Sequence, residues 1–311
     1  MKNKQIGLLF AGQGSQYPGM GLDFYQTFDF VQKMYKEASE ILSYDISEIC
    51  FTENFLMNQT EYTQPAILLV TCSIYEVLKR KGLNVVAGCG FSLGEYSALY
   101  ASGVFDFRAV VSLIKKRAYY MHACANKTDG AMAAIIGLDL KSGEELCKET
   151  DTKIANYNSP IQFVIAGKKD KVLLAMEKAT EYGAKRVVML NVSGAFHHPL
   201  MKEAALDLKP YLIEAPKKEP NFPVIMNCDA LPLEIDDLSD KLEKQIYSPV
   251  RFEESVRFMV EKYQVDMLLE IGPGKVLSGL SKRIVPGVRL MNIEKLDDFN
   301  TFIKEELNES N

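Results

Sequence analysis

Short apolar runs alternate with amphipathic stretches over most of the chain. The apolar runs are rich in aliphatic and β-branched residues and are too short for helices, which is typical of buried strands. They are IGLLFAG (6–12), NVVAGCG (84–90), VDMLLEIG (265–272) and VRLMNI (288–293). Segments between them carry apolar residues at helical spacing, such as FVQKMYKEASEIL and GKVLSGLSKRI. This alternation predicts a parallel sheet covered by helices.

Two further segments carry signals for the start and the end of a helix. PAILLVTCSIYEVLKRKG (65–82) follows Thr63, a residue type that caps helix N-termini, and has Pro65 in its first turn and Gly82 at its end. SLGEYSALYASG (92–103) directly follows the second predicted strand and also ends at a glycine. We therefore expect one helix with Thr63 as its N-cap and another that starts at the serine.

The segment 129–193 has a different order of predicted strands and helices. It predicts strands in GAMAAIIGL, TKIANYN, QFVIAG and AKRVVMLNV, and helices in SGEELCKET and DKVLLAMEKATEYG. The two middle strands form a predicted hairpin around residues 158–160, so the order is β-α-β-β-α-β, that of a ferredoxin-like unit. We therefore predict an α/β fold in which a large domain, 1–128 and 194–311, carries a small ferredoxin-like domain inserted at 129–193.

Composition and charge exclude several classes of protein. The 311 residues carry a formal net charge of −5, so no overall basic field is present to hold nucleic acid or an anionic membrane. The six cysteines are far apart and include no C-x-x-C pair, which argues against a zinc site or a disulfide framework. No apolar run approaches the length of a membrane span. We expect a cytoplasmic protein that binds neither nucleic acid nor membranes.

The stretch GCGFSLGEYS (88–97) contains the pattern G-x-S-x-G around Ser92. A strand is predicted before this serine and a helix after it, which is the setting of a nucleophile elbow. The amide of Leu93 would then lie at a helix N-terminus and could donate to an oxyanion. The alternative is a serine that caps the helix, a role that requires neither Gly90 nor Gly94.

A nucleophilic serine needs a base, and the chain has only three histidines. His122 lies in a predicted helix, where a structural role is expected. His197 and His198 follow a strand and a glycine, so one of these two is the candidate base. An α/β-hydrolase usually places its histidine near the C-terminus, whereas more than a hundred residues follow here, so a hydrolase arrangement fits poorly.

Three other features of the sequence bear on which kinds of ligand the protein binds. AGQGSQ follows a strand, but Tyr17 stands where a dinucleotide-binding fingerprint requires glycine. GPGKVL lacks the spacing and the hydroxyl residue of a phosphate-binding P-loop. Arg117 would matter only for a substrate with a carboxylate, which a guanidinium binds through two parallel hydrogen bonds.

Taken together, these segments strongly resemble the malonyl-CoA:acyl carrier protein transacylases and the related acyltransferase domains of polyketide synthases. The resemblance runs nearly from end to end, with Ala11 where the family usually has proline. Eight motifs follow in the family's order: LLFAGQGSQYPGMG, YTQPAILL, GCGFSLGEYSAL, KKRAYYM, NYNSPIQFVIAG, VSGAFHHPLM, QIYSPVRF and LEIGPGKVLSGL. The family's fold, a hydrolase-like α/β domain with an inserted ferredoxin-like domain, agrees with the pattern above.

The resemblance implies roles for the catalytic residues. Ser92 matches the acylated nucleophile, and His197 matches the catalytic histidine, which leaves His198 at a variable position. Gln13 and Leu93 match the residues whose backbone amides form the oxyanion hole. Gln245 matches the glutamine whose backbone carbonyl orients the histidine in place of a triad acid.

Substrate-binding residues are implied in the same way. Arg117 would bind the free carboxylate of the malonyl group, and Met121 and Asn158 would line the acyl pocket. Phe196 precedes the histidine, as in enzymes that select malonyl over methylmalonyl, because its ring fills space that an α-methyl group needs. Phe91 departs from the family, which commonly has histidine there, so any help that this histidine gives is absent.

The implied reaction is a ping-pong transfer of malonyl from malonyl-CoA through Ser92 to the phosphopantetheine thiol of acyl carrier protein, without metal or redox cofactor. The same residues fit a separate acyltransferase of a polyketide synthase, and less well a thioester hydrolase or an inactive scaffold. A monomer is implied. Five residues are candidates for docking an acidic carrier protein: Lys115, Lys116, Lys275, Lys282 and Arg283.

Overall fold

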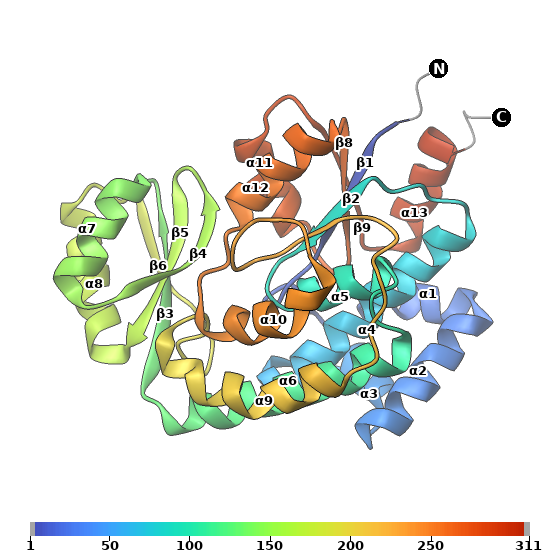
Figure 1. Cartoon of the computed structure of the whole chain (residues 1–311), viewed down its shortest axis with the longest axis horizontal. Helices are drawn as coiled ribbons and strands as arrows, with labels where there is room; N and C mark the ends of the chain where they lie inside the picture. Colours follow the sequence, from blue (N-terminus) through green and yellow to red (C-terminus); the bar gives the residue numbers. More distant parts are fainter. Residues whose placement is uncertain (1–3, 308–311) are drawn as a thin grey trace.

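A computed structural model describes residues 4–307 and contains two separate sheets (Figure 1). The larger sheet is parallel, with strand order β7-β2-β1-β8-β9, and the smaller is antiparallel, with order β4-β5-β3-β6. The predicted α/β fold class is thereby confirmed. In Figure 1 the antiparallel sheet and its two helices lie at one end of the molecule, away from both termini.

The parallel sheet is buried on both faces. Along β1 (Ile6–Phe10), Leu8 and Phe10 belong to the large core cluster, whereas Leu9 packs on the opposite face among residues of α11 and α12. This alternation follows from the two-residue repeat of a strand and explains why the run has no polar position. The other strands are β2 (Ala87–Gly90), β7 (Val224–Ile225), β8 (Met267–Ile271) and β9 (Arg289–Ile293).

Helices cover both faces of this sheet (Figure 1). None of the helices between residues 4 and 307 is long and apolar enough to cross a membrane. Those outside the smaller sheet are α1 (Leu22–Thr27), α2 (Asp29–Leu42), α3 (Ile46–Phe51), α4 (Thr60–Arg80), α5 (Gly94–Ala101), α6 (Phe107–Lys127), α9 (Lys202–Glu214), α10 (Leu238–Tyr247), α11 (Phe252–Tyr263), α12 (Val276–Ile284) and α13 (Leu296–Phe302).

The antiparallel sheet has the ferredoxin-like arrangement that the sequence predicts. Its elements follow in the order β3 (Gly130–Ile136), α7 (Leu140–Thr150), β4 (Lys153–Ser159), β5 (Gln162–Lys168), α8 (Lys169–Glu181) and β6 (Arg186–Met189). β3 pairs with both β5 and β6, so the first and third strands of the unit are central. The division of the chain into an inserted domain at 129–193 and a surrounding one stays a prediction.

A short stretch of backbone joins the two parts of the molecule. Val250, between α10 and α11, forms a bridge with Asn156 of β4. Its amide donates to the carbonyl of Ala155 at 2.9 Å, and its carbonyl accepts from the amide of Tyr157 at 2.9 Å. The antiparallel sheet is therefore extended by a segment that belongs to the larger part of the molecule.

The expected N-cap of the fourth helix is wrong. α4 begins at Thr60, so Thr63 and Pro65 both lie inside it. The hydroxyl of Thr63 donates to the carbonyls of Met57 and Gln59, and does not cap a helix N-terminus. Only five helical residues precede Pro65, so it lies near the start of the helix, where proline disturbs the hydrogen-bond pattern least.

The turn between β2 and α5 is packed too tightly for any side chain at its two glycines. A Cβ atom on Gly90 would lie 1.9 Å from the carbonyl carbon of Gly94, and one on Gly94 would lie 2.1 Å from the carbonyl oxygen of Phe10. These contacts are with backbone, so no side chain can move to relieve them. The start of α5 is therefore pressed against the end of β1.

We predict that Gly94→Ala lowers the free energy of unfolding by about 3 kcal/mol, because the new methyl group forces β1 and α5 apart. Gly279→Ala is the matched control, since Gly279 lies in a helix with no atom within 4 Å of its Cβ position. This control should raise stability by about 0.5–1 kcal/mol through helix propensity. Urea unfolding of both variants measures the difference, and equal stabilities would contradict the tight packing.

Candidate active site

Ser92 stands in a strained turn at the carboxyl end of the parallel strands. Its backbone has φ +54°, in the left-handed region that residues with a side chain rarely adopt. The turn is held by Asn227, whose Oδ1 accepts from the amide of Ser92 at 2.7 Å and whose Nδ2 donates to the carbonyl of Gly90 at 2.7 Å. The side chain of Asn227 therefore bonds to the backbone at both Gly90 and Ser92, and it holds the sharp turn that is typical of a nucleophile elbow.

His197 faces this serine from a loop that follows the antiparallel sheet. The distance between His197 Nε2 and Ser92 Oγ is 2.7 Å. His197 Nδ1 lies 2.8 Å from the carbonyl oxygen of Gln245, which only accepts, so the ring proton is on Nδ1 and Nε2 accepts from the serine hydroxyl. Burial, together with the charge of Arg117, lowers the pKa of His197 to about 4. The imidazole is therefore neutral at pH 7, the form that can act as a base.

The acceptor for His197 comes from the end of a helix. Gln245 lies in the last turn of α10, where carbonyl groups have no partner within the helix. Two of these carbonyls are used by one residue, since the amide of His197 also donates to the carbonyl of Ile246 at 3.2 Å. A helix C-terminus favours positive charge, so this position stabilises the imidazolium that forms when the histidine takes a proton.

Arg117 is a buried cation next to the serine. Its side chain is 1% exposed, and its NH2 group donates to Ser92 Oγ at 3.1 Å. Its other partners are the neutral amide oxygens of Gln64, at 2.6 Å, and Gln245, at 2.9 Å. Within residues 4–307 no carboxylate lies within 4.0 Å of this guanidinium, and its Nε atom has no hydrogen-bond partner. Burial lowers the pKa of Arg117, so an anion that enters the site would be bound strongly.

Backbone amides for an oxyanion are present at the expected positions. Leu93 directly precedes α5, and among the described residues its amide donates to no other group. The same holds for the amide of Gln13, in the turn after β1, whose side chain is held by Thr60 at 3.2 Å. The turn lies against the elbow, because a Cβ atom on Gly12 would be 2.5 Å from the carbonyl oxygen of Phe91.

The remaining predicted pocket residues are buried in different surroundings. The sulfur of Met121 accepts from the side-chain amide of Gln64 at 3.6 Å, which places it beside the arginine's partner. Phe196 is 6% exposed and packs in the large core cluster. Asn158 is 6% exposed with an unpartnered Oδ1, and no hydrogen bond among residues 4–307 links it to Ser92. Phe91 packs on Phe252, with ring centroids 5.4 Å apart, and so faces an apolar cluster.

The other two histidines do not contact the serine. His198 Nδ1 accepts from the amide of Leu200 at 3.2 Å and so caps a short turn. His122 lies on α6 with Asn126 as its hydrogen-bond partner at 3.0 Å. Of the two adjacent histidines, only His197 is therefore in contact with the serine. His122 contacts its own helix, in agreement with the structural role that the sequence predicts.

Residues that the sequence analysis did not single out complete the site. Gln64 binds the guanidinium, Asn227 holds the elbow, and Glu95 is a buried carboxylate that contacts both Asn227 and Gln245. A glutamate inside the otherwise apolar start of α5 was the one available signal. Gln64 and Asn227 gave none, because their contacts join segments that are far apart in the chain.

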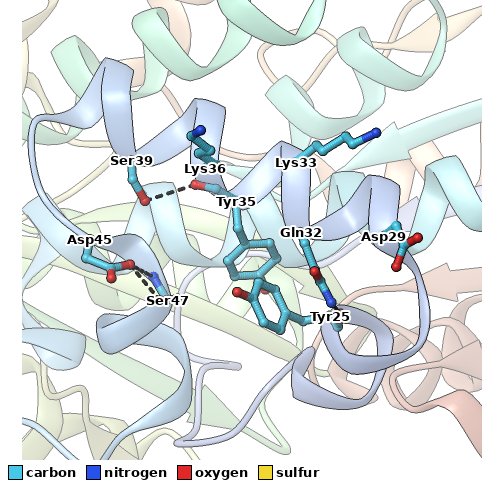
Figure 2. Close-up of a pocket in the computed structure, with 9 residues that line it drawn as sticks. All are labelled: Tyr25, Asp29, Gln32, Lys33, Tyr35, Lys36, Ser39, Asp45 and Ser47. Atoms are coloured by element: carbon cyan, nitrogen blue, oxygen red, sulfur yellow. Dashed lines mark hydrogen bonds between the residues drawn. The ribbon is translucent and has the colours of Figure 1, made fainter.

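Two surface hollows lie apart from these residues. Figure 2 shows the larger, of about 710 Å³, which lies beside α2 and is lined by polar residues such as Lys33, Lys36 and Asp45. The smaller, of about 370 Å³, lies between α6 and α9 next to Lys116 and Tyr211. Neither is lined by Ser92, His197 or Arg117, so the chemistry belongs to the elbow and not to these hollows.

The arrangement can form and break an acyl ester at Ser92. It contains a serine with a neutral base, a buried cation beside the serine hydroxyl and two backbone amides that donate to no group among residues 4–307. This combination is that of an acyl-transfer site.

Comparisons with known proteins agree with this class. The acyl transferase domain family matches residues 8–285. The malonyl CoA-acyl carrier protein transacylase of Bacillus subtilis (strain 168) is 41% identical over 287 residues, 90% of each chain. The crystal structure of MCAT from Streptococcus pneumoniae has 39% identity and a TM-score of 0.92, and the match covers 97% of this chain and 100% of that one.

A third relative was solved with its partner. It is a malonyl-transacylase in complex with the holo form of a type II polyketide synthase acyl-carrier protein, with 38% identity and a TM-score of 0.93 over 97% of this chain and 99% of that one. This chain therefore belongs to the acyl transferase family, and within it to the family of malonyl CoA-acyl carrier protein transacylases. It is an acyltransferase, as the resemblance of its motifs implied.

The lowered pKa of His197 gives a prediction about pH. A fluorophosphonate that reacts with Ser92 needs the neutral imidazole as a base, so its rate should fall only as the pH drops toward about 4. An unperturbed histidine would place this fall near pH 6.5. Mass spectrometry of the labelled protein over pH 4–7 measures the rate.

Two variants identify the group that titrates. His197→Gln should remove the reactivity at every pH. His198→Gln should leave the profile unchanged, although burial also lowers the pKa of His198 to about 4. A profile with its midpoint near 6.5, or one that follows His198, would contradict this assignment.

Proposed function

We propose that this protein transfers the malonyl group from malonyl-CoA to the phosphopantetheine thiol of acyl carrier protein, through a malonyl ester on Ser92. The single observation that carries the proposal is the guanidinium of Arg117, buried 3.1 Å from the serine hydroxyl without a carboxylate partner among the described residues. A buried cation is costly unless an anion joins it. The free carboxylate of a malonyl group supplies that anion at the required place.

The first half-reaction acylates the serine. His197 takes the proton of Ser92 while the serine oxygen attacks the thioester carbonyl, and the amides of Gln13 and Leu93 stabilise the oxyanion. The carbonyl of Gln245 accepts from Nδ1 of the imidazolium and holds it in place. The intermediate then collapses, the thiolate of CoA leaves with the proton from His197, and malonyl remains on the serine.

The second half-reaction repeats these steps with a new thiol. His197 takes the proton of the phosphopantetheine thiol, the thiolate attacks the ester, and the serine oxygen recovers a proton as it leaves. Proton transfer and charge stabilisation are both supplied by the chain itself, so the proposed steps use no metal or redox cofactor. The bound carboxylate fixes the orientation of the ester, which favours the thiol over water.

The acyl group is proposed to be malonyl and not methylmalonyl. Phe196 is the residue before the base and is 6% exposed in the core. An α-methyl group would need the space that its ring fills, and one methyl group is worth about 1–3 kcal/mol in such a pocket. Asn158 and Met121 are proposed to line the rest of the acyl pocket.

We assign the activity to fatty-acid synthesis, and polyketide synthesis is the second candidate. The observation that favours the second is the relative of 38% identity in complex with a type II polyketide synthase carrier protein. Both pathways use the same chemistry at Ser92, and the preferred carrier protein distinguishes them. A hydrolase of neutral acyl groups fits less well, because it would have no use for Arg117.

We predict that malonyl-CoA alone adds one malonyl group to Ser92, seen as an intact-mass shift and located by peptide mapping. Acetyl-CoA should label the protein weakly, since it offers no carboxylate. Arg117→Ala should lower the rate of malonylation by about 10²-fold or more, the scale on which loss of a positioning contact acts. Arg108→Ala is the matched control, because Arg108 is an exposed arginine of the same helix.

Other outcomes would indicate a different activity or a different mechanism. Steady release of malonate without an adduct would indicate a hydrolase. Equal labelling by acetyl-CoA and malonyl-CoA, or equal rates for the two arginine variants, would contradict the carboxylate-binding role. An adduct on any residue other than Ser92 would contradict the proposed intermediate.

Docking of the carrier protein is proposed to use α12. Lys115 and Lys116 are already engaged, by the carbonyl of Ile41 at 2.7 Å and by the ring of Tyr211 at 4.6 Å. Lys275 and Lys282 are exposed on or beside α12, and the exposed Arg283 donates to the side-chain oxygen of Gln162 at 3.0 Å. This helix begins directly after β8, at the edge of the sheet where Ser92 lies, so an acidic carrier bound there would be close to the serine.

We predict that reversing the charges of Lys275, Lys282 and Arg283 to glutamate raises the KM for acyl carrier protein about tenfold and leaves the KM for malonyl-CoA unchanged. Loss of electrostatic complementarity acts chiefly on the encounter of the two proteins. A triple reversal on the helices of the antiparallel sheet, at Lys141, Lys148 and Lys171, is the control. Steady-state kinetics would contradict the proposal if both triple variants behaved alike or if both KM values rose together.

A further inference from the structure

Glu95 is a buried carboxylate that the proposed reaction does not use. It lies in the first turn of α5, three residues after Ser92, and is 1% exposed. No cationic group lies within 4.0 Å of it among residues 4–307. A carboxylate without a salt bridge at such a depth is costly, so its contacts need an explanation.

One oxygen of this carboxylate holds the residue that fixes the elbow. Glu95 Oε1 accepts from the backbone amide of Asn227 at 2.5 Å. The side chain of Asn227 in turn accepts from the amide of Ser92 and donates to the carbonyl of Gly90. The left-handed backbone of Ser92 is therefore supported by a chain of hydrogen bonds that ends on Glu95.

The other oxygen holds the residue that orients the base. Glu95 Oε2 accepts from Nε2 of Gln245 at 2.6 Å, and the same nitrogen donates to the carbonyl of Ser92 at 2.8 Å. With its nitrogen held in this way, the amide of Gln245 must present its oxygen to Arg117. The backbone carbonyl of Gln245 accepts from His197, so one residue connects the carboxylate with both the guanidinium and the imidazole.

We propose that Glu95 is a positioning residue that sets, through Asn227 and Gln245, the geometry of the serine, the histidine and the arginine together. This proposal depends on the function proposed above for one thing, the identity of the substrate. It adds that Ser92, Arg117 and His197, which come from three separate segments of the chain, share one buried anchor. Within residues 4–307 the side chain of Glu95 makes no hydrogen bond to Ser92 Oγ or to the imidazole of His197.

The hydrogen-bond donors around Glu95 favour its carboxylate form, whereas its burial opposes that form. Both oxygens accept from N–H donors, which a carboxylate satisfies and a protonated acid satisfies only in part. Burial raises the pKa of Glu95 to about 8, against the hydrogen bonds and the charge of Arg117. The other titratable groups that face it include Asp229, whose charge acts in the same direction as burial. They also include the phenol of Tyr96 and the buried thiols of Cys89 and Cys228, whose pKa values burial raises.

The test compares Glu95→Gln with a matched variant. The substitution keeps the shape but turns one acceptor into a donor, which then meets either the amide of Asn227 or the NH2 group of Gln245. We expect single-turnover malonylation of Ser92 to slow by about 10²-fold, as for a small misplacement of reacting groups. Glu306→Gln is the control, since Glu306 is also a buried carboxylate (4% exposed) but contacts Lys4 and Arg289. This control should keep the wild-type rate.

A double-mutant cycle separates positioning from a general loss of stability. Glu95→Gln and Asn227→Ala should be strongly non-additive in their effects on rate, because both break the same chain of hydrogen bonds. Glu306→Gln and Asn227→Ala should be additive. A merely destabilised protein would not show this difference.

The reaction with a fluorophosphonate gives the same comparison without malonyl-CoA, because it needs only Ser92 and His197. A rate in Glu95→Gln within twofold of the wild type, or additive effects with Asn227→Ala, would overturn the proposal. If the wild type reacts with the fluorophosphonate but is not malonylated, the proposed function fails, and the fluorophosphonate rates still decide the role of Glu95.

Discussion

The close approach of β1, the elbow and α5 is the constraint on which the rest of this site depends. With hydrogen atoms in place of side chains at Gly90 and Gly94, the first turn of α5 lies against the carbonyl of Phe10. This contact forces the backbone of Ser92 into the left-handed region, at φ +54°. Such a conformation costs of order 1–3 kcal/mol, and it persists because hydrogen bonds on both sides of the serine hold it.

His197 is oriented without the carboxylate that a catalytic triad would supply. The C-terminus of α10 takes the place of that acid, because its free carbonyls accept hydrogen bonds from both Nδ1 and the backbone amide of His197. A carboxylate here would bind Arg117 and so neutralise the cation that the proposed substrate needs. A helix end offers partial negative charge without that competition, which explains physically why orientation and substrate binding can coexist within a few ångströms.

Most of the fold was predictable from the sequence, because strands and helices leave periodic patterns. The alternation of short runs and amphipathic stretches indicated the parallel sheet, and the β-α-β-β-α-β order indicated the antiparallel one. The start of α4 was not predictable, since Pro65 and Thr63 suggest an N-terminus that tertiary contacts override. For the site, motif spacing singled out Ser92, whereas Glu95 and Asn227 act through contacts between segments more than a hundred residues apart.

The bridge between Val250 and β4 gives the molecule a mechanical linkage. Val250 lies five residues after Gln245, and its amide and carbonyl are both bonded to the edge strand of the antiparallel sheet. The position of the C-terminal end of α10 is therefore tied to the position of the antiparallel sheet. The carbonyl that orients His197 is held in register with both parts of the molecule, although His197 itself makes no bond to that sheet's edge strand among the described residues.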